Sequence, residues 1–437
     1  MRKGLFRAIC LILALATVFS LAACGDKNAY EAEVGEVMFR EKEDKVSETA
    51  DGDPTVVPDV NIRIYNYAPS VFQEDENTRH VYYCSNKYTS ATDYNRDVDG
   101  DDQMTDWIVY RKGVKKNGEW SWGEKKYLFG PLIGSETEGE HICDPNVIKG
   151  EFKYKGTTYP YLMAYLACGT RNNTFNHISL AVAEKPEGPW TRCEDINPII
   201  KYTAEGVPDQ VSGKYLWGFG QASMISVDKK GRVLMFHSSI RPYYEGLDND
   251  GNEKWVQRTC TTVARYNFSD LSNIATEFKI DRMGIEGIKR YGAQTDVVSN
   301  GDYAYDETTG RIYGITDTSY KPEYRINGAP FYCTDNGEGE IGDCFKRQSE
   351  GGSAPVWNTL HLFKASDAYN YVSCHNNAII RDGYGRILDS KNIEVALTGS
   401  CAKGNFMKVH PEAVDPPVPT PRFEWSYRIL RQTFTLD

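Results

Sequence analysis

The chain contains 437 residues, of which 40% are hydrophobic, and its 61 acidic and 50 basic side chains give a formal net charge of -11. A chain of this length can form two or three average domains or one repetitive all-β domain. Because phosphate binding requires a basic surface, the acidic balance excludes nucleic acid from the expected partners. The 29 tyrosines and 8 tryptophans are typical of a β protein whose rings pack in the core or stack on ligands.

The amino terminus, MRKGLFRAICLILALATVFSLAACGDKN, begins with basic residues and continues with an apolar run over residues 8–21. This arrangement is typical of a secretory signal. The letters LAAC at the end of the run resemble a bacterial lipobox, which implies removal of residues 1–23 and lipidation of Cys24. The alternative is an ordinary signal peptide that happens to contain a cysteine. Lipid chains bind membranes, and no other apolar run approaches the ~20 residues that span a bilayer. We therefore expect a protein anchored through Cys24 at the bacterial cell surface or envelope.

The next segment is acidic. Between residues 26 and 60, eleven acidic side chains are set against four basic ones, with almost no aromatic residues. Such a segment cannot bury a core. We predict a flexible tether over residues 24–60 and one folded domain over residues 61–437.

Nine cysteines remain beyond Cys10 and Cys24. They have neither CxxC spacing nor a nearby histidine cluster, so we interpret them as structural thiols or disulfides and not as a zinc site. An exported chain can pair some of them. Cys333 and Cys344, which flank a short loop, are the first candidates for a disulfide.

The folded segment repeats one pattern five times. Each repeat has a short polar start, a strand, a turn and a second strand rich in Tyr, Leu or Phe. Further strand-forming runs follow, such as DWIVYRKGVKKNGEWSW and NIEVALTGS, and no long stretch has helical periodicity. The pattern predicts an all-β, five-bladed β-propeller, with an array of two-sheet sandwiches as the alternative. The final residues, RFEWSYRILRQTFTLD, either complete the last blade or close the ring. The repeats, 76, 77, 81 and 73 residues apart, start at Ala68, Asp144, Gln221, Asp302 and His375.

An acidic loop interrupts the first repeat. The run NRDVDGDDQMTD places Asn95, Asp97, Asp99 and Asp106 at positions 1, 3, 5 and 12 of an EF-hand-like loop, with Gly100 at the sharp turn. The spacing predicts a possible calcium site. The alternative is a solvated acidic loop, because an aspartate replaces the usual glutamate at position 12.

The innermost strands of a propeller run along its axis, so we expect the repeat starts to meet at one end of a central channel. Asp144 and Asp302 would contribute carboxylates there, Gln221 an amide and His375 an imidazole. Each acid has an alternative role as the cap of a turn. Recurrence of polar groups at the same point of four repeats favours a site.

The runs DPNVIK, ISLAVAEKPEGPW, GQASM and CHNNAIIRDGYGRI resemble the five-bladed propeller glycoside hydrolases, in particular family 43. The resemblance implies a general base on blade one, a carboxylate that tunes proton affinity on blade three and a glutamate general acid on blade four. This chain has Ala68, Gln221 and Asp302 at those starts, so the family mechanism does not transfer directly. The pair His375 and Asn376 resembles the last-blade histidine near the axis, which helps to hold an ion or water.

Glycosidic cleavage needs one protonated carboxyl and one ionised carboxylate. We predict Asp144 and Asp302 as this pair, roughly 6 to 9 Å apart, a gap that favours inversion over retention. An apolar wall such as Trp217 or Phe219 would raise the pKa of one of them. Glu286 is a further catalytic candidate. Glu140, like Glu286, has a role in a surface loop as its alternative.

The predicted function is hydrolysis of a glycosidic bond in an oligo- or polysaccharide, with no cofactor required for the chemistry. The alternative is a non-catalytic glycan-binding protein on the same fold. Sugar binding requires flat aromatic faces that pack on the ring and polar side chains that form hydrogen bonds with its hydroxyls. The residues predicted to supply them are Trp217, Gln221, Arg241, Tyr303, Trp357, His375 and Asn376.

Overall fold

The computed structural model describes residues 36–38, 66–87, 105–170, 174–203, 217–281, 283, 300–316, 329–363, 373–401 and 426–436. All of them belong to one compact unit, Val34–Asp437. None of the helices in these segments is long and apolar enough to cross a membrane. The predicted signal peptide and Cys24 lie outside the described residues.

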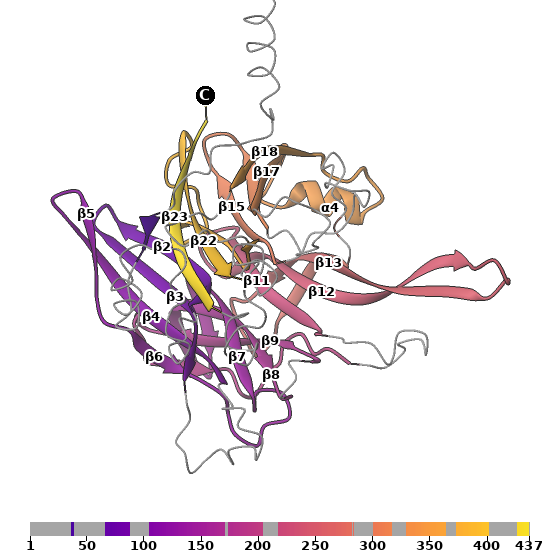
Figure 1. Ribbon diagram of the computed structural model, residues 1–437, viewed down its shortest axis with the longest axis horizontal. Coiled ribbons are helices and arrows are strands. Elements are labelled where there is room, and N and C mark those ends of the chain that lie inside the picture. The colour runs from indigo at the N-terminus through magenta and orange to yellow at the C-terminus, as the bar shows by residue number, and fades with distance from the viewer. Residues whose placement is uncertain are drawn as a thin grey trace, which may run out of the picture. The chain divides into compact units, whose positions relative to one another are not determined.

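Five sheets of predominantly antiparallel strands follow one another along the chain as the blades of a five-bladed β-propeller (Figure 1), which confirms the predicted all-β class. Blade one contains β2 (Tyr67–Asp75), β3 (Thr78–Lys87), β4 (Thr105–Lys116), β5 (Glu119–Trp122) and β6 (Lys126–Phe129). Blade two contains β7 (His141–Tyr154), β8 (Thr157–Cys168), β9 (His177–Ala183) and β10 (Trp190–Arg192). Blade three contains β11 (Phe219–Ser226), β12 (Arg232–Leu247), β13 (Glu253–Asn267) and β14 (Ala275–Ile280).

Blade four contains β15 (Asp302–Asp306), β16 (Arg311–Ile315), β17 (Ala329–Asp335) and β18 (Trp357–Phe363), with the short helix α4 (Asp343–Ser349) between its last two strands. Blade five contains β19 (Ser373–Cys374), β20 (Ala378–Ile379), β22 (Asn392–Cys401), β23 (Ser426–Thr435) and β1 (Glu36–Val37). The short strand β21 (Arg381–Asp382) leaves blade five and pairs in parallel with β2 of blade one.

The ring closes through its innermost strands. Each contacts the innermost strand of the next blade, from β2 through β7, β11 and β15 to β20 and back to β2. Apolar clusters fill the five junctions between neighbouring blades. Middle strands such as β9 are therefore buried on both faces, and all seven of its residues, HISLAVA, are buried. This arrangement fixes the positions of the innermost strand ends, where the site lies.

Local turn chemistry sets the register of the hairpins. In blade one, Asn117 and Gly118 join β4 to β5 with φ of 52° and 88°. Two central residues with positive φ form the turn that matches the twist of a hairpin, and an Asn-Gly pair adopts it at low cost. The alternation of strands and such turns is why the sequence pattern predicts the blades.

Both ends of the folded unit meet in blade five. The strand β23 pairs with β22, so the carboxyl-terminal run completes the last blade, one of the two roles expected for it. The strand β1 then pairs with β23, Glu36 opposite Arg431 and Val37 opposite Leu430, and Met38 is buried. Residues 36–37, which lie in the segment predicted as a flexible tether, therefore form an edge strand of blade five along the unpaired side of β23.

Candidate active site

One residue at the start of each blade has a left-handed backbone. Because residues other than glycine rarely adopt this conformation, its recurrence marks an equivalent and strained position. In blades one to three it coincides with a shift of register between the first two strands, a bulge that bends the strand and re-aims its side chains. The five residues, 76, 77, 79 and 76 positions apart, are Ala68 (φ 50°), Asp144 (φ 46°), Gln221 (φ 31°), Asn300 (φ 51°) and Asn376 (φ 51°).

The structure shifts the predicted repeat in two blades. Asn300 occupies the blade-four position that the sequence analysis gave to Asp302, and Asn376 occupies the blade-five position given to His375. Asp302 lies two residues further along and accepts a hydrogen bond from Asn146, which stands two residues after Asp144. Since strand residues two apart face the same side, Asp302 belongs to a deeper layer of the ring.

Three of the left-handed residues, Asp144, Asn300 and Asn376, line a cavity of about 260 Å³. Tyr67, Cys143, Gly220 and His375 each precede a left-handed residue and line it. A cavity of this size is at the lower end of small-molecule sites. Its remaining lining residues are Asp106, Leu166, Asn176 and Trp217.

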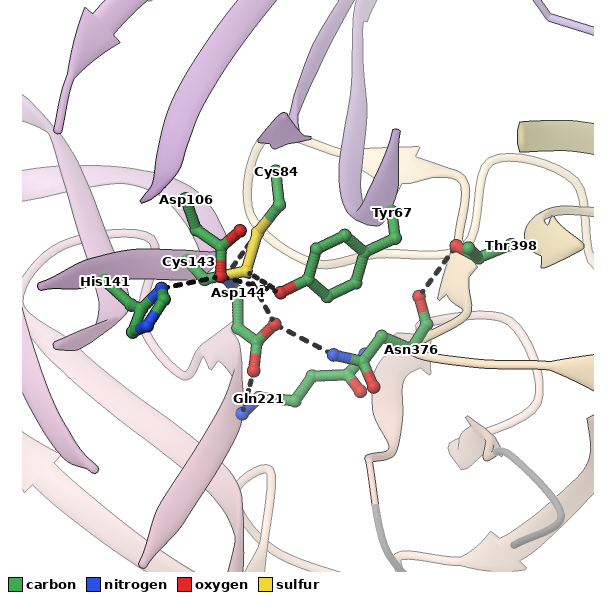
Figure 2. The surroundings of a disulfide bond; sticks show 9 residues. All are labelled: Tyr67, Cys84, Asp106, His141, Cys143, Asp144, Gln221, Asn376 and Thr398. Atoms are coloured by element: carbon green, nitrogen blue, oxygen red, sulfur yellow. Dashed lines mark hydrogen bonds and ion pairs between the residues drawn. A yellow bond between two sulfur atoms is a disulfide. The ribbon is translucent and has the colours of Figure 1, made fainter. Parts of the chain in front are cut away.

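Asp144 is the most perturbed acid of this cavity. Its residue surface is 5% exposed. Burial raises the pKa of its carboxyl to about 6, and the charge of Asp106 also raises it. The Gln221 backbone N–H, which donates to Oδ2 at 3.1 Å, the charge of His375 and the Asn376 amide, which donates to Oδ1 at 2.8 Å, lower the pKa (Figure 2). A carboxyl with a pKa near 6 can give or take a proton close to neutral pH.

Asp106 supplies a second carboxylate to the same cavity. It lies on β4 of blade one, and its Oδ2 is 3.3 Å from His141 Nδ1 and accepts a hydrogen bond from the Tyr67 hydroxyl at 3.4 Å (Figure 2). The sequence predicts Asp106 as a calcium ligand, whereas the structure places it on the cavity wall. The other predicted ligands, Asn95, Asp97 and Asp99, lie outside the described residues.

Three amide oxygens at this end of the ring lack a hydrogen-bond donor in the part of the chain that the structure describes. They are Asn176 Oδ1, Gln221 Oε1 and Asn376 Oδ1. Asn176 and Asn376 line the cavity, and Gln221 follows its lining residue Gly220. Buried polar atoms are nearly always paired, so the two oxygens of lining residues, those of Asn176 and Asn376, are suited to accept hydrogen bonds from a ligand.

A disulfide forms part of the cavity wall. Cys84 of β3 and Cys143 of β7 are joined, which links blade one to blade two, and the Asp144 backbone N–H donates to Cys84 Sγ at 3.0 Å (Figure 2). The predicted pair Cys333 and Cys344 is not joined. Within the described chain, the one group with metal-ligand spacing is Cys84, Cys143 and Asp144. Because its sulfurs are bonded to each other, only the carboxylate could coordinate an ion.

Asp302 has a different environment. It is 2% exposed, lies outside the lining of the cavity, and its carboxylate is 3.4 Å from Arg381 Nη1. Its Oδ1 accepts a hydrogen bond from Ser223 at 2.6 Å, and its Oδ2 accepts one from the Ile379 backbone at 2.9 Å. These contacts join blades three, four and five beneath the cavity. The geometry therefore assigns Asp302 to a buried ion pair and leaves Asp144 without its predicted partner.

The other predicted residues divide into two groups. Trp217 and His375 line the cavity, and His375 stacks on Tyr67 with ring centroids 6.1 Å apart. Tyr303 and Trp357 are at most 1% exposed and pack between blades three and four, so neither can bind a sugar. Glu286 and the side chain of Arg241 lie outside the described residues.

A second cavity, of about 600 Å³, lies between blades one and five. Its buried charges bind one another. Arg79 Nη1 donates to Glu394 Oε1 at 3.3 Å, and Arg431 Nη1 donates to the same oxygen at 2.7 Å. The Arg79–Glu394 pair links blade one to blade five, whereas Arg431 and Glu394 both belong to blade five. The cavity lacks a group comparable to Asp144 among its lining residues.

Three residues of the cavity, Asp106, Asn176 and Asn300, were not predicted as such from the sequence. Asn300 had a detectable signal, since counting from it makes the repeat spacings more even, with a largest step of 79 in place of 81. Asp106 lies on the third strand of blade one and Asn176 directly precedes the third strand of blade two, and only the closure of the ring brings them to the axis.

Known proteins resemble this chain in fold and not detectably in sequence. No protein-family model matches the chain, and no curated protein matches it. Similar solved structures include a family 117 glycoside hydrolase from Zobellia galactanivorans, with 11% identity, 91% of this chain and 87% of that chain covered, and a TM-score of 0.48. A thermostable family-43 glycoside hydrolase has 11% identity over 85% of this chain and 90% of its own, with a TM-score of 0.44. An endo-arabinase from Bacteroides thetaiotaomicron has 11% identity over 87% and 98%, with a TM-score of 0.39. Identities this low concern the fold alone.

Proposed function

We propose that the protein hydrolyses a glycosidic bond of a neutral carbohydrate in the cavity around Asp144. The observation that carries the proposal is the presence of two carboxylates on one cavity wall, one of which, Asp144, has a pKa of about 6. Glycosidic cleavage requires such a pair, one carboxyl that protonates the leaving oxygen and one carboxylate that activates water or attacks carbon.

The environments of the two acids suggest their roles. Asp144 is the proton donor, because burial keeps part of its population protonated at neutral pH. Asp106 is the second carboxylate, since it lines the same cavity and lies beside the imidazole of His141. Asp106 replaces Asp302 in the pair expected from the sequence, because the carboxylate of Asp302 already pairs with Arg381 and accepts a hydrogen bond from Ser223.

The cavity also has the chemistry for sugar recognition. The unpaired oxygens of Asn176 and Asn376, which line the cavity, can each accept a hydrogen bond from a sugar hydroxyl. Trp217 and Leu166 provide apolar surface on the same wall for the C–H faces of a ring. Two carboxylates in a small, partly enclosed space repel an anionic group. A single neutral sugar unit fits this combination better than a uronic acid or a sulfated sugar.

One observation favours a second candidate function, non-catalytic glycan binding. Both oxygens of Asp144 already accept hydrogen bonds, from Gln221 and Asn376. A carboxyl held in this way can position ligand-binding amides without exchanging a proton with a substrate. The two functions differ in one measurable respect, which is whether bound glycan is cleaved.

The test is a panel of neutral oligo- and polysaccharides incubated with the folded domain, with new reducing ends as the readout. We expect cleavage of at least one glycan, and a loss of about a hundredfold or more in Asp144→Asn. Asp335→Asn is the matched control, because Asp335 has a 73% exposed side chain on blade four. Binding without cleavage by the wild type would establish the second function. Equal cleavage by wild type and Asp144→Asn would remove Asp144 from the mechanism.

We further propose that the domain acts at the cell surface. The basic and apolar amino terminus with its LAAC sequence supports removal of residues 1–23 and a lipid anchor on Cys24. A surface anchor would hold the cavity near glycans outside the cell.

A further inference from the structure

The second and third strands of blade three extend beyond their sheet as a two-stranded arm, residues 241–258. Pairing of β11 with β12 reaches Ser239, opposite Phe219, and pairing of β14 with β13 begins at Val263. From Arg241 opposite Arg258 to Leu247 opposite Glu253, the two strands pair only with each other within the described chain. Figure 1 shows this hairpin projecting from the blade.

The arm leaves the blade at the end where the cavity lies. The Ile240 backbone N–H donates to Gly218 O at 2.9 Å, and Gly218 follows Trp217, which lines the cavity. Tyr244 stands four residues beyond Ile240. At ~3.4 Å per residue its Cα lies roughly 14 Å along the strand from Ile240, a distance that a chain of a few sugar units spans.

One face of the arm carries an aromatic pair formed by an exposed tyrosine and a half-buried tryptophan. Tyr244 lies directly opposite Trp255, and their ring centroids are 5.4 Å apart with planes inclined at 53°. Tyr244 is 44% exposed and Leu247 is 64% exposed. The Trp255 indole N–H donates to Glu253 Oε2 at 3.0 Å, which holds that ring in place. Large exposed apolar side chains gathered on one projecting element are typical of a binding surface.

The tip of the arm is well ordered and acidic. Asp248 Oδ1 accepts backbone hydrogen bonds from Asp250 at 2.9 Å and Asn252 at 2.8 Å. Residues 244–256, YEGLDNDGNEKWV, contain four acids and one lysine, and the two arginines of the arm, Arg241 and Arg258, stand at its base. This charge repels phosphate and anionic lipid surfaces. An uncharged partner with flat apolar faces suits both the rings and the charge.

We propose that the arm is a second carbohydrate contact, on which Tyr244 and Trp255 stack neutral sugar units of the same glycan that enters the cavity. The inference rests on the proposed function for the identity of the ligand, although it does not require cleavage. It commits to a glycan chain as the occupant. A second copy of this chain on the arm is the competing outcome.

Affinity electrophoresis in gels of arabinan, galactan and laminarin tests the arm without reference to cleavage. We expect the wild type to be retarded in at least one gel, and the double variant Tyr244→Ala, Trp255→Ala to bind roughly tenfold more weakly. Trp255→Phe should keep most of the retardation, because a flat ring remains. Lys254→Ala is the control, since Lys254 lies on the opposite face and pairs with Glu245.

Equal retardation of wild type and double variant, or no retardation of either, would overturn the proposal. A dimer in sedimentation equilibrium that the double variant abolishes would assign the arm to self-association. The proposed function fails separately, if the wild type releases no reducing ends from glycans that it binds. The arm and the cavity are thus tested by different readouts.

Discussion

Asparagine at position 144 should stabilise the protein at neutral pH relative to the wild type. The carboxyl of Asp144 has a pKa of about 6 in the folded protein against an ordinary value of 3.8. A folded-state pKa above the unfolded one means that folding favours the protonated form. The stability this gives is present below about pH 4 and is lost as the pH rises through about 6. Each pKa unit corresponds to 1.36 kcal/mol, so ionisation of Asp144 costs the folded state about 3 kcal/mol at pH 7.5.

The Asp144→Asn variant does not pay the cost of ionisation, but it has one side-chain oxygen fewer to accept a hydrogen bond. Its single side-chain oxygen can satisfy either the Gln221 N–H or the Asn376 amide, and the lost hydrogen bond costs about 1 kcal/mol at every pH. At pH 4, close to the unfolded pKa, ionisation costs the wild type only about 0.5 kcal/mol. We therefore expect the variant to be about 0.5 kcal/mol less stable than the wild type at pH 4 and about 2 kcal/mol more stable at pH 7.5.

Urea unfolding of both oxidised proteins at pH 4, 5, 6 and 7.5 measures this difference. Groups that titrate identically in the two proteins cancel when the free energies of unfolding are subtracted at each pH. A difference that rises with pH and levels off above pH 6 supports the reasoning. A difference that stays constant from pH 4 to pH 7.5 would refute it, because Asp144 would then have the same pKa in the folded and unfolded chains.

Three further predictions concern other parts of the molecule. Asp302→Asn should lower the free energy of unfolding by about 3 to 5 kcal/mol, because Arg381 would remain buried without its counter-charge; a loss below 1 kcal/mol in urea unfolding would contradict the ion-pair role. Gly220→Ala should raise the KM for a cleaved glycan about tenfold with little change in Tm, since the added Cβ would lie 3.3 Å from the Trp217 ring and 3.5 Å from Asp144 Oδ2. An unchanged KM would mean that the ligand does not reach this wall. Cys24→Ala should release the protein from the membrane fraction, and its retention there after processing would rule out the lipid anchor.

The blades could be predicted from the sequence because their signals are local. Each hairpin combines strand-forming runs with turn residues such as Asn117 and Gly118, and five such units are periodic along the chain. It was harder to predict which residue of each blade occupies the equivalent position at the site. Asn300 precedes the regular pairing of β15, which begins at Asp302, so a strand-based alignment selects the wrong residue by two positions.

The composition of the site depends on contacts between blades, which have no local signature. Asp106 reaches the cavity from the third strand of blade one, and Cys84 meets Cys143 across a junction of two blades. Cys333 and Cys344 were the closest pair in sequence, yet both remain buried thiols, because short separation does not fix the orientation of two side chains. The edge strand at Glu36–Val37 forms only because β23 offers an unpaired side.

The dependence of kcat/KM on pH tests the catalytic role of Asp144 most directly. With the glycan that the panel identifies, we expect kcat/KM to fall at high pH with an apparent pKa of about 6, because the free enzyme must hold Asp144 in its protonated form to donate to the leaving oxygen. Activity should therefore fall tenfold for each pH unit above that value, and Asp144→Asn should lack this fall along with most of the activity. A profile that is flat between pH 5 and pH 8, or turnover that Asp144→Asn preserves, would contradict this role of Asp144.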